Sequence, residues 1–310
     1  MKKHQTNVVL SLKNFCDFNH VPLAAIYKRN TWNRMCILAN VKTNSSNVNE
    51  TELAQAVCKK WLACNSYTYL NFILQLAKNN FEEIENPSHE DLLCLNMLYY
   101  DFWQKPRLFL TLNEAISSIG KNKIVVSEII EVLEIIIDKI AHIELDIDLP
   151  YNQPLKVHSR FTRAQILAGF GVNNFQSKTG SIAGVLNIKN KNTELLFITL
   201  EKTEEKYSPT TMYNDYAKSE TIFHWQSQNS TTPESKSGQS YINQEELNKN
   251  ILLFVREKET DIYNNTMSYV FLGESKFIDS NGSQPMNINW ELKEPIPHYM
   301  WKETAKMAVG

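Results

Sequence analysis

The spacing of the apolar residues changes at 149–154, a segment with prolines at positions 150 and 154. Before this segment, apolar residues recur every three or four positions, the spacing of helices that bury one face. After it, short alternating runs lie between turn residues, a pattern typical of strands joined in hairpins. The 310 residues are enough for two domains. We therefore predict an all-α helical domain over residues 1–150 and a second, β-rich domain over residues 151–310.

The segment 126–140 carries the clearest helical pattern of the first half. Seven apolar residues share one face at helical spacing: Val126, Ile129, Ile130, Leu133, Ile136, Ile137 and Ile140. Four carboxylates lie mostly opposite and are expected to form a solvated face: Glu128, Glu131, Glu134 and Asp138. Two further helix starts are predicted from capping pairs, Asn49 with Glu52 and Ser88 with Asp91.

Short strands, two hairpins and one capped helix are expected in the second half. Thr162 with Gln165 forms a capping box and opens a helix that should end near Gly169. One hairpin should turn at 189–193 and another at 281–282. The predicted fold class is α + β, in which the helical domain precedes a mixed, mainly antiparallel β-barrel.

Several kinds of chemistry have no signature in this chain. No GxxxxGK[ST] phosphate loop and no GxGxxG stretch occur, and no nucleophile stands at a recognisable spacing from a base. Five cysteines are present without a CxxC pair, as expected for reduced thiols rather than a metal site. We therefore expect no cofactor, no metal and no enzyme activity from the chain by itself.

The net charge and the N-terminal residues limit the partners and the cellular location that the sequence predicts. The formal net charge is −2, so a nucleic-acid partner would have to be held by local basic patches. The N-terminal residues contain no uninterrupted apolar segment, which argues against a signal peptide or a membrane span. A cytoplasmic protein is expected.

The segment 207–231 concentrates six rings: Tyr207, Tyr213, Tyr216, Phe223, His224 and Trp225. Short polar side chains lie between them. Apolar faces beside fixed donors and acceptors are what a pocket for a planar, hydrogen-bonding ligand such as a nucleobase requires. The alternative is a buried, aromatic-rich strand pair whose polar residues turn the chain.

Several separate motifs resemble one family of restriction enzymes. They are HSRFTRAQILAGFG, LLFITLEK, the segment 207–231, YVFLG and PMNINWEL. Together they resemble the C-terminal target-recognition region of SauUSI-like modification-dependent (type IV) restriction enzymes. In that family a phospholipase-D-like nuclease and a helicase precede this region, and neither motif set is found here. The resemblance implies a barrel similar to SRA or PUA domains, which binds double-stranded DNA and flips 5-methylcytosine or 5-hydroxymethylcytosine into a pocket.

A pocket of this kind can be assigned to residues of the aromatic segment. Asp215 is expected to accept from the N4 amino group of a flipped cytosine, and polar side chains nearby to donate to its N3 or O2. Phe223 is more readily a core residue. The predicted base pocket comprises Tyr213, Asp215, Tyr216, Ser219, Trp225, Gln226 and Ser227.

The predicted DNA-backbone contacts centre on the capped helix that Thr162 opens. Its free N–H groups, beside Arg160 and Arg163, would suit a phosphate. An ordinary capped helix with two surface arginines explains the same residues equally well. The full set is His158, Arg160, Thr162, Arg163, Lys178 and Lys206.

Three functions remain open. The first is a reader of modified bases that works with the nuclease and helicase parts of an ATP-dependent restriction enzyme. The second is a module that binds unmodified DNA or RNA. The third is an assembly domain that docks the motor and binds no base.

Overall fold

The chain forms two compact units in a computed structural model that describes residues 11–28, 30–42, 50–180, 183–201, 215–261 and 264–301. The helical unit consists of Met1–Ala141, Asn152–Leu155 and Phe161–Thr179. The sheet unit consists of His142–Tyr151, Lys156–Arg160 and Gly180–Gly310. The capped helix after Thr162 therefore groups with the helical unit.

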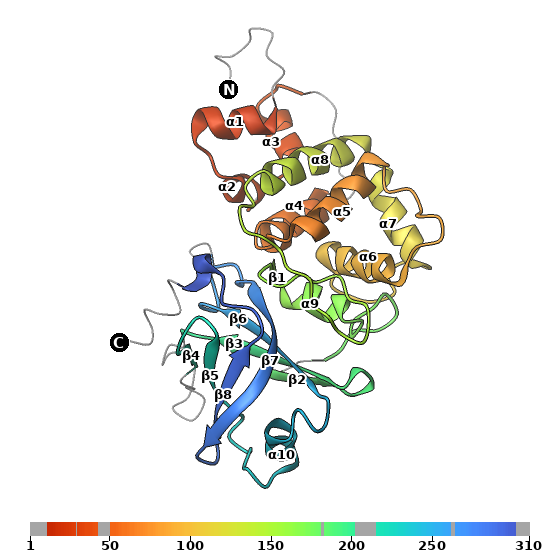
Figure 1. Cartoon of the computed structure of the whole chain (residues 1–310). Coiled ribbons are helices and arrows are strands. Elements are labelled where there is room, and N and C mark those ends of the chain that lie inside the picture. The colour runs from red at the N-terminus through yellow and green to blue at the C-terminus, as the bar shows by residue number, and fades with distance from the viewer. Residues whose placement is uncertain are drawn as a thin grey trace. The chain divides into compact units, whose positions relative to one another are not determined.

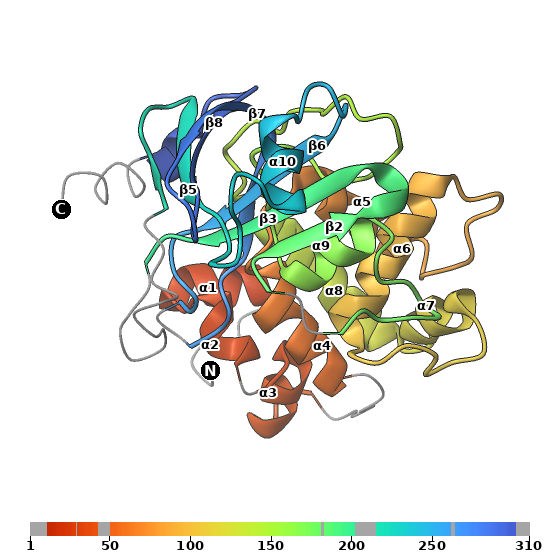
Figure 2. The same ribbon diagram turned by 90° about the horizontal axis from the view of Figure 1, so that it is seen from below.

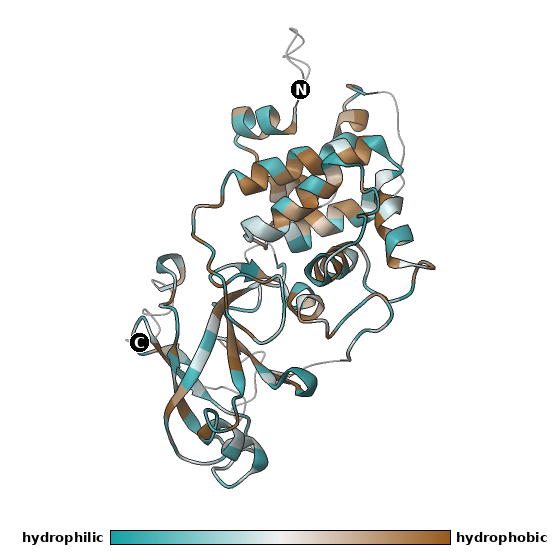
Figure 3. Cartoon of the chain, turned by 45° about the vertical axis from the view of Figure 1, so that its right-hand side comes forward, coloured by the Kyte–Doolittle hydropathy of each residue, from teal (hydrophilic) through white to brown (hydrophobic). Residues whose placement is uncertain are grey.

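In the helical unit, α8 packs against α5 and α9 against α6 (Figure 1). Both brown and teal bands run along its helices in Figure 3, as expected for helices that bury one face. The helices are α1 (Leu12–Asn19), α2 (Leu23–Tyr27), α3 (Trp32–Leu38), α4 (Glu50–Ala56), the π-helical turn η2 (Val57–Trp61), α5 (Tyr67–Lys78), α6 (His89–Phe102), α7 (Leu112–Gly120), α8 (Lys123–Ile137) and α9 (Arg163–Gly169).

The helix predicted over 126–140 is confirmed as α8, except that it ends at Ile137 and so excludes Ile140. Both described capping boxes are present, at Ser88 and at Thr162. Asn49, the other predicted cap, lies outside the described residues. The solvated acidic face is wrong at Glu128, which is buried. Its carboxylate accepts hydrogen bonds from the Tyr27 hydroxyl at 2.6 Å and from the Trp32 backbone N–H at 2.6 Å. These donors replace water, so the helix buries this position as well.

A second buried carboxylate joins four elements of the helical unit. Asp101 of α6 accepts from the Trp61 indole at 2.9 Å, the Tyr69 hydroxyl at 2.7 Å and the Gln165 amide at 3.0 Å. Trp61 ends η2, Tyr69 lies in α5 and Gln165 in α9. Because each donor comes from a different element, the network fixes their relative positions.

The sheet unit contains one mixed sheet whose strands run in the order β2-β3-β6-β7-β8-β5-β4, with β1 paired to β7. Along this strand order, only β3 and β6 are parallel within the described residues, and the other neighbours are antiparallel. The strands are β1 (Arg160–Phe161), β2 (Val185–Ile188), β3 (Thr193–Thr199), β4 (Tyr216–Ala217), β5 (Ile222–Gln226), β6 (Asn250–Arg256), β7 (Tyr269–Asn281) and β8 (Asn287–Leu292); the helical turns are η3 (Lys189–Lys191) and α10 (Lys236–Ile242).

The α + β class and the mixed, mainly antiparallel sheet are confirmed, but the closed barrel is wrong. The described sheet is open, because β2 and β4 end the strand order and do not pair with each other. Closure needs a continuous hydrogen-bond ladder around the whole sheet. The end strands are short, with four residues in β2 and two in β4.

One hydrophobic core of the sheet unit lies on the face of the sheet where α10 packs against β7 (Figure 2). Phe223, Trp290 and Ile288 are fully buried there, and Phe223 is confirmed as a core residue. On the other face of β3, β6 and β7, the buried rings of Phe197, Phe254 and Phe271 stack on one another. Gly273 lets the backbone of β7 approach the Val157 side chain closely, because a Cβ at this position would stand 3.2 Å from it. Its φ of 86° also favours glycine. In the part of the chain that the structure describes, no helix is long and apolar enough to cross a membrane.

Candidate functional site

The face of the sheet opposite the core carries a row of polar side chains across four strands. Tyr216 pairs with His224, His224 with Asn289, and Asn289 with Asp279, so one residue comes from each of β4, β5, β8 and β7. We call these four residues the cross-strand row. The rings of Tyr216 and His224 lie 4.8 Å apart and tilted by 38°. The row therefore combines an aromatic pair with hydrogen-bonding groups on one sheet face.

Hydrogen bonds along the row set the proton position on His224. Asp279, as a carboxylate, can only accept, so the Asn289 side-chain nitrogen donates to it at 2.5 Å. The Asn289 carbonyl oxygen then faces His224 Nδ1 at 3.2 Å. Nδ1 therefore carries a hydrogen, and in the neutral tautomer of this kind Nε2 is the acceptor.

A second set of polar contacts on the same face surrounds Gln226. Its backbone N–H donates to Asp215 Oδ1 at 2.9 Å, and its side-chain amide donates to Asn287 Oδ1 at 2.9 Å. Asp215 is only 7% exposed. The carboxylate predicted to read the base is therefore engaged by the protein backbone through this oxygen.

The two predicted pocket serines stabilise turns of the chain. Ser227 is fully buried, and its hydroxyl accepts from the Met286 backbone N–H at 2.9 Å. The Ser219 hydroxyl accepts from the backbone N–H groups of Thr221 at 3.3 Å and Ile222 at 3.0 Å. Hydroxyl groups held in this way define the entry to β5 and the exit from it.

Trp225 lies in the hydrophobic core, on the face opposite Tyr216. Its ring contacts Tyr241 at 5.5 Å and Trp290 at 6.3 Å between centroids. The structure thus brings Tyr216 and Gln226 to one face and Trp225 to the other. Two predicted residues, Tyr213 and Lys206, lie outside the described residues.

The predicted backbone contacts divide between the two units. In the sheet unit, the two terminal guanidinium nitrogens of Arg160, Nη1 and Nη2, donate to Glu257. The Tyr299 ring centroid lies 5.4 Å from the guanidinium carbon. Burial alone would raise the pKa of Glu257, but the hydrogen bonds and charge of Arg160 lower it overall. His158 Nε2 lies 3.0 Å from the Pro295 carbonyl oxygen.

In the helical unit, Thr162, Arg163 and Lys178 lie on or after α9. The Thr162 hydroxyl accepts from the Gln165 backbone N–H at 3.3 Å, as a helix cap. Arg163 is half-buried at the first position of the helix. Lys178 is exposed, and its ammonium donates to the Gln104 carbonyl oxygen at 2.7 Å.

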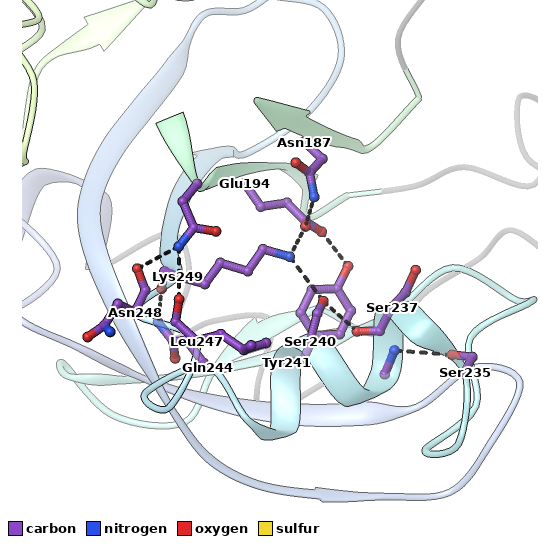
Figure 4. Close-up of polar contacts among 12 residues, drawn as sticks. Asn187, Glu194, Ser235, Ser237, Ser240, Tyr241, Gln244, Leu247, Asn248 and Lys249 are labelled. Carbon is purple, nitrogen blue, oxygen red and sulfur yellow. Dashed lines mark hydrogen bonds and ion pairs between the residues drawn. The ribbon is translucent and has the colours of Figure 1, made fainter. Parts of the chain in front are cut away.

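A buried polar cluster of the sheet unit was missed by sequence reasoning (Figure 4). Lys249 donates to Glu194 and to the Ser240 hydroxyl, the latter at 3.0 Å. Tyr241 donates to the other Glu194 oxygen at 2.6 Å. Burial, followed by the charge of Glu194, raises the pKa of Tyr241, so its hydroxyl stays protonated as a donor. The only sequence signal for this cluster was Glu194, a glutamate directly before the apolar residues 195–198.

No group of three His, Cys, Asp or Glu side chains among the described residues could hold a metal ion. None of the five cysteines forms a disulfide. Residues 155–304 match a family described as a domain of unknown function, DUF3427. No curated protein matches the chain.

Proposed function

We propose that this chain binds double-stranded DNA that carries a modified cytosine, as the target-recognition part of a modification-dependent restriction enzyme. The resemblance of five separate motifs to SauUSI-like enzymes supports this assignment. The match over residues 155–304 covers nearly the same part of the chain, although that family has no described function.

The observation that carries the proposal is the cross-strand row. Tyr216 lies in β4, at one end of the strand order, and is half-buried. Its ring lies tilted against the His224 ring of β5. A base stacked on an aromatic ring gains about 1–3 kcal/mol, which offsets the few kcal/mol lost when the base leaves the duplex. Tyr216 is therefore the ring that we propose stacks on the flipped base.

The hydrogen-bonding groups of the row complement a cytosine edge. Cytosine offers its N4 amino group as a donor. With the hydrogen on Nδ1, the Nε2 of the largely buried His224 ring can accept, and Asp279 is an exposed carboxylate on the same face. The proposed pocket therefore differs from the one predicted from the sequence. It contains His224 and Asp279 instead of Trp225, and the Gln226 amide lies beside them.

Recognition of a single methyl group gives limited discrimination. Burying one methyl contributes about 0.8 kcal/mol, a factor of roughly four in affinity. We propose that the nuclease and helicase parts of the enzyme amplify this difference, and that the chain itself supplies neither activity and needs no cofactor.

The proposal is tested by titrating the protein with methylated and plain duplexes in a fluorescence anisotropy assay. Tyr216→Ala should lower affinity for the methylated duplex about tenfold or more and reduce the preference over plain DNA. Tyr67→Ala, which removes a 51% exposed ring of α5, is the matched control and should bind as wild type. An unchanged methyl preference in Tyr216→Ala would refute the site.

An assembly domain that binds no base is the second candidate, and the Arg160–Glu257 pair favours it. Both side chains are less than one-fifth exposed, so the most central predicted phosphate contact is neutralised within the protein. If wild-type protein retards neither duplex at low salt, this second function replaces the first.

A further inference from the structure

A loop joins α6 and α7 in the helical unit (Figure 1). It exposes apolar and basic side chains together. We call residues 104–111 the 104–111 loop. Leu110 is 90% exposed and Leu108 is 50% exposed. Lys105 and Arg107 are exposed in the same loop. Exposed leucines in such a setting favour a binding role, because a folded chain otherwise tends to bury large apolar side chains.

The loop is held in one conformation by α6. The Tyr99 hydroxyl donates to the Lys105 carbonyl oxygen at 2.6 Å and accepts from the Leu108 backbone N–H at 3.3 Å. The Arg107 backbone N–H donates to the Phe175 carbonyl oxygen at 2.9 Å. These hydrogen bonds fix the backbone of the loop. The exposed side chains are therefore held in position for binding, although they pack against little of the protein.

Arg107 adopts a left-handed backbone conformation, with φ of 55°. This region is unfavourable for a residue with a long side chain, and Asn or Gly would adopt it more easily. Strain of this kind is often found at binding sites, where the surrounding structure maintains it.

A third basic residue lies at the loop from another part of the same unit. The Lys178 ammonium donates to the Gln104 carbonyl oxygen at 2.7 Å, and it lies 5.8 Å above the Tyr100 ring. Lys178 therefore adds a third positive charge beside those of Lys105 and Arg107. Glu114 is the carboxylate that approaches the loop, through a hydrogen bond from the Leu110 N–H at 2.8 Å.

We propose that the 104–111 loop and Lys178 form a second contact surface for DNA. Lys105, Arg107 and Lys178 would bind phosphates, and the two leucines would press against bases or sugars in a groove. Apolar side chains flanked by basic ones suit this role, because DNA presents apolar base faces between charged strands. A protein partner would use the leucines but gain less from three surrounding cations. The inference rests on the proposed function, since it takes DNA as the ligand of the chain.

Two double variants of the full chain separate the two kinds of contact. Lys105→Ala with Arg107→Asn should weaken binding to methylated and plain duplexes equally, by about tenfold. It should also make the slope of log affinity against log salt concentration shallower by about two, because two phosphate contacts are lost and each one displaces roughly one counterion. Asn is chosen at position 107 because it tolerates the left-handed backbone. Leu108→Ser with Leu110→Ser should weaken binding several-fold at unchanged salt dependence.

Lys121→Ala with Lys123→Asn is the charge-matched control, because both lysines are exposed in the same unit at the junction of α7 and α8. This control should bind as wild type. If the basic loop variant also keeps wild-type affinity and salt dependence while wild type still prefers methylated DNA, the inference is wrong. The exposed leucines would then be a docking surface for protein. If wild type binds neither duplex, the proposed function fails instead.

Discussion

Lys249 and Glu194 form an ion pair with both side chains buried, and the pair connects the residue before β6 to the parallel neighbour β3 (Figure 4). The side chains are 6% and 5% exposed. Tyr241 and Asn187 donate to the same carboxylate at 2.6 and 3.2 Å, so the charge is surrounded by donors. The cluster thereby holds α10, which contains Tyr241, against the sheet.

Lys249→Met should destabilise the sheet unit strongly. The change leaves the Glu194 carboxylate buried without its cation, and removal of one partner from a buried pair costs about 3–5 kcal/mol. Thermal unfolding should show the loss as a lower Tm. The double change Lys249→Met with Glu194→Gln should cost less than the sum of the single changes, because no buried charge remains.

The exposed pair of Lys276 and Glu245 supplies the control for that experiment. Its side chains are 64% and 75% exposed, with the nitrogen and oxygen 3.6 Å apart. Lys276→Met should change stability by about 1 kcal/mol or less, because water screens the interaction. Equal losses from the buried and the exposed pair would contradict the structural role assigned to Lys249.

The local patterns predicted the elements well, since their signals lie within a few residues. The capping boxes at Ser88 and Thr162 and the helix α8 belong to this group. The parallel alignment of β3 and β6 has no local signal, because each residue of β3 pairs with a residue 57 positions later in the chain. Burial of Glu128 similarly depends on donors of α2 and α3, about 100 residues earlier.

At the candidate site, the sequence could predict which face of the sheet a residue lies on, but not its partners from other strands. Residues two apart in a strand share a face, so Phe223 and Trp225 must point the same way. The structure has both in the core. The alternation was therefore readable in the sequence once β5 was assigned. The partners of His224 were not readable, because Asn289 and Asp279 come from other strands.

Asp101 should make the helical unit less stable as the pH rises from about 4 to about 6. Burial raises the pKa of this carboxyl to about 6, although nearby Lys60 and the three donors oppose the shift. The unfolded chain has a pKa near 3.9, so the folded state holds the extra proton in this interval. Stability then falls by about 3 kcal/mol, at about 1.4 kcal/mol per pH unit, and levels off above pH 6.

Asp101→Asn should flatten this pH dependence, since the amide does not titrate. Urea unfolding at several pH values, followed by hydrogen exchange in α5 and α6, measures the slope. The raised pKa of Glu128, caused by burial, contributes in the same direction and should persist in the variant. Asp138→Asn replaces an exposed carboxylate as the control. A slope in Asp101→Asn equal to that of wild type would exclude Asp101 as the titrating group.

Gly238→Ala should destabilise the sheet unit at the first turn of α10. A Cβ at this position would stand 2.0 Å from the Thr232 carbonyl oxygen, so backbone must move. Overpacking of this kind costs about 1–3 kcal/mol. Gly180→Ala is the matched control, because a Cβ there meets no atom within 4 Å. Thermal unfolding of both variants gives the comparison, and a Tm for Gly238→Ala at or above that of the control would oppose the prediction.

Asn289→Asp should destabilise the cross-strand row at neutral pH. The new carboxylate takes the place of the amide nitrogen that donates to Asp279 at 2.5 Å, so two negative charges meet and one hydrogen bond is lost. Like charges this close raise the pKa of one carboxyl. We expect a loss of roughly 1–3 kcal/mol at pH 7. Near pH 4.5 one carboxyl is protonated, its O–H replaces the amide donor, and most of the stability should return.

Asn287→Asp provides the comparison within the same strand. The Gln226 amide donates to the Asn287 side-chain oxygen, and the Asn287 side-chain nitrogen donates to the Asn281 side-chain oxygen. The new carboxylate therefore keeps one donor and meets a neutral amide oxygen rather than a second carboxylate. Its destabilisation should therefore be smaller and nearly independent of pH. Thermal unfolding of both variants at pH 4.5 and pH 7 measures the difference. An identical pH response in the two variants would mean that Asn289 does not donate to Asp279. The orientation of the Asn289 amide, from which the hydrogen on His224 Nδ1 is inferred, would then be wrong.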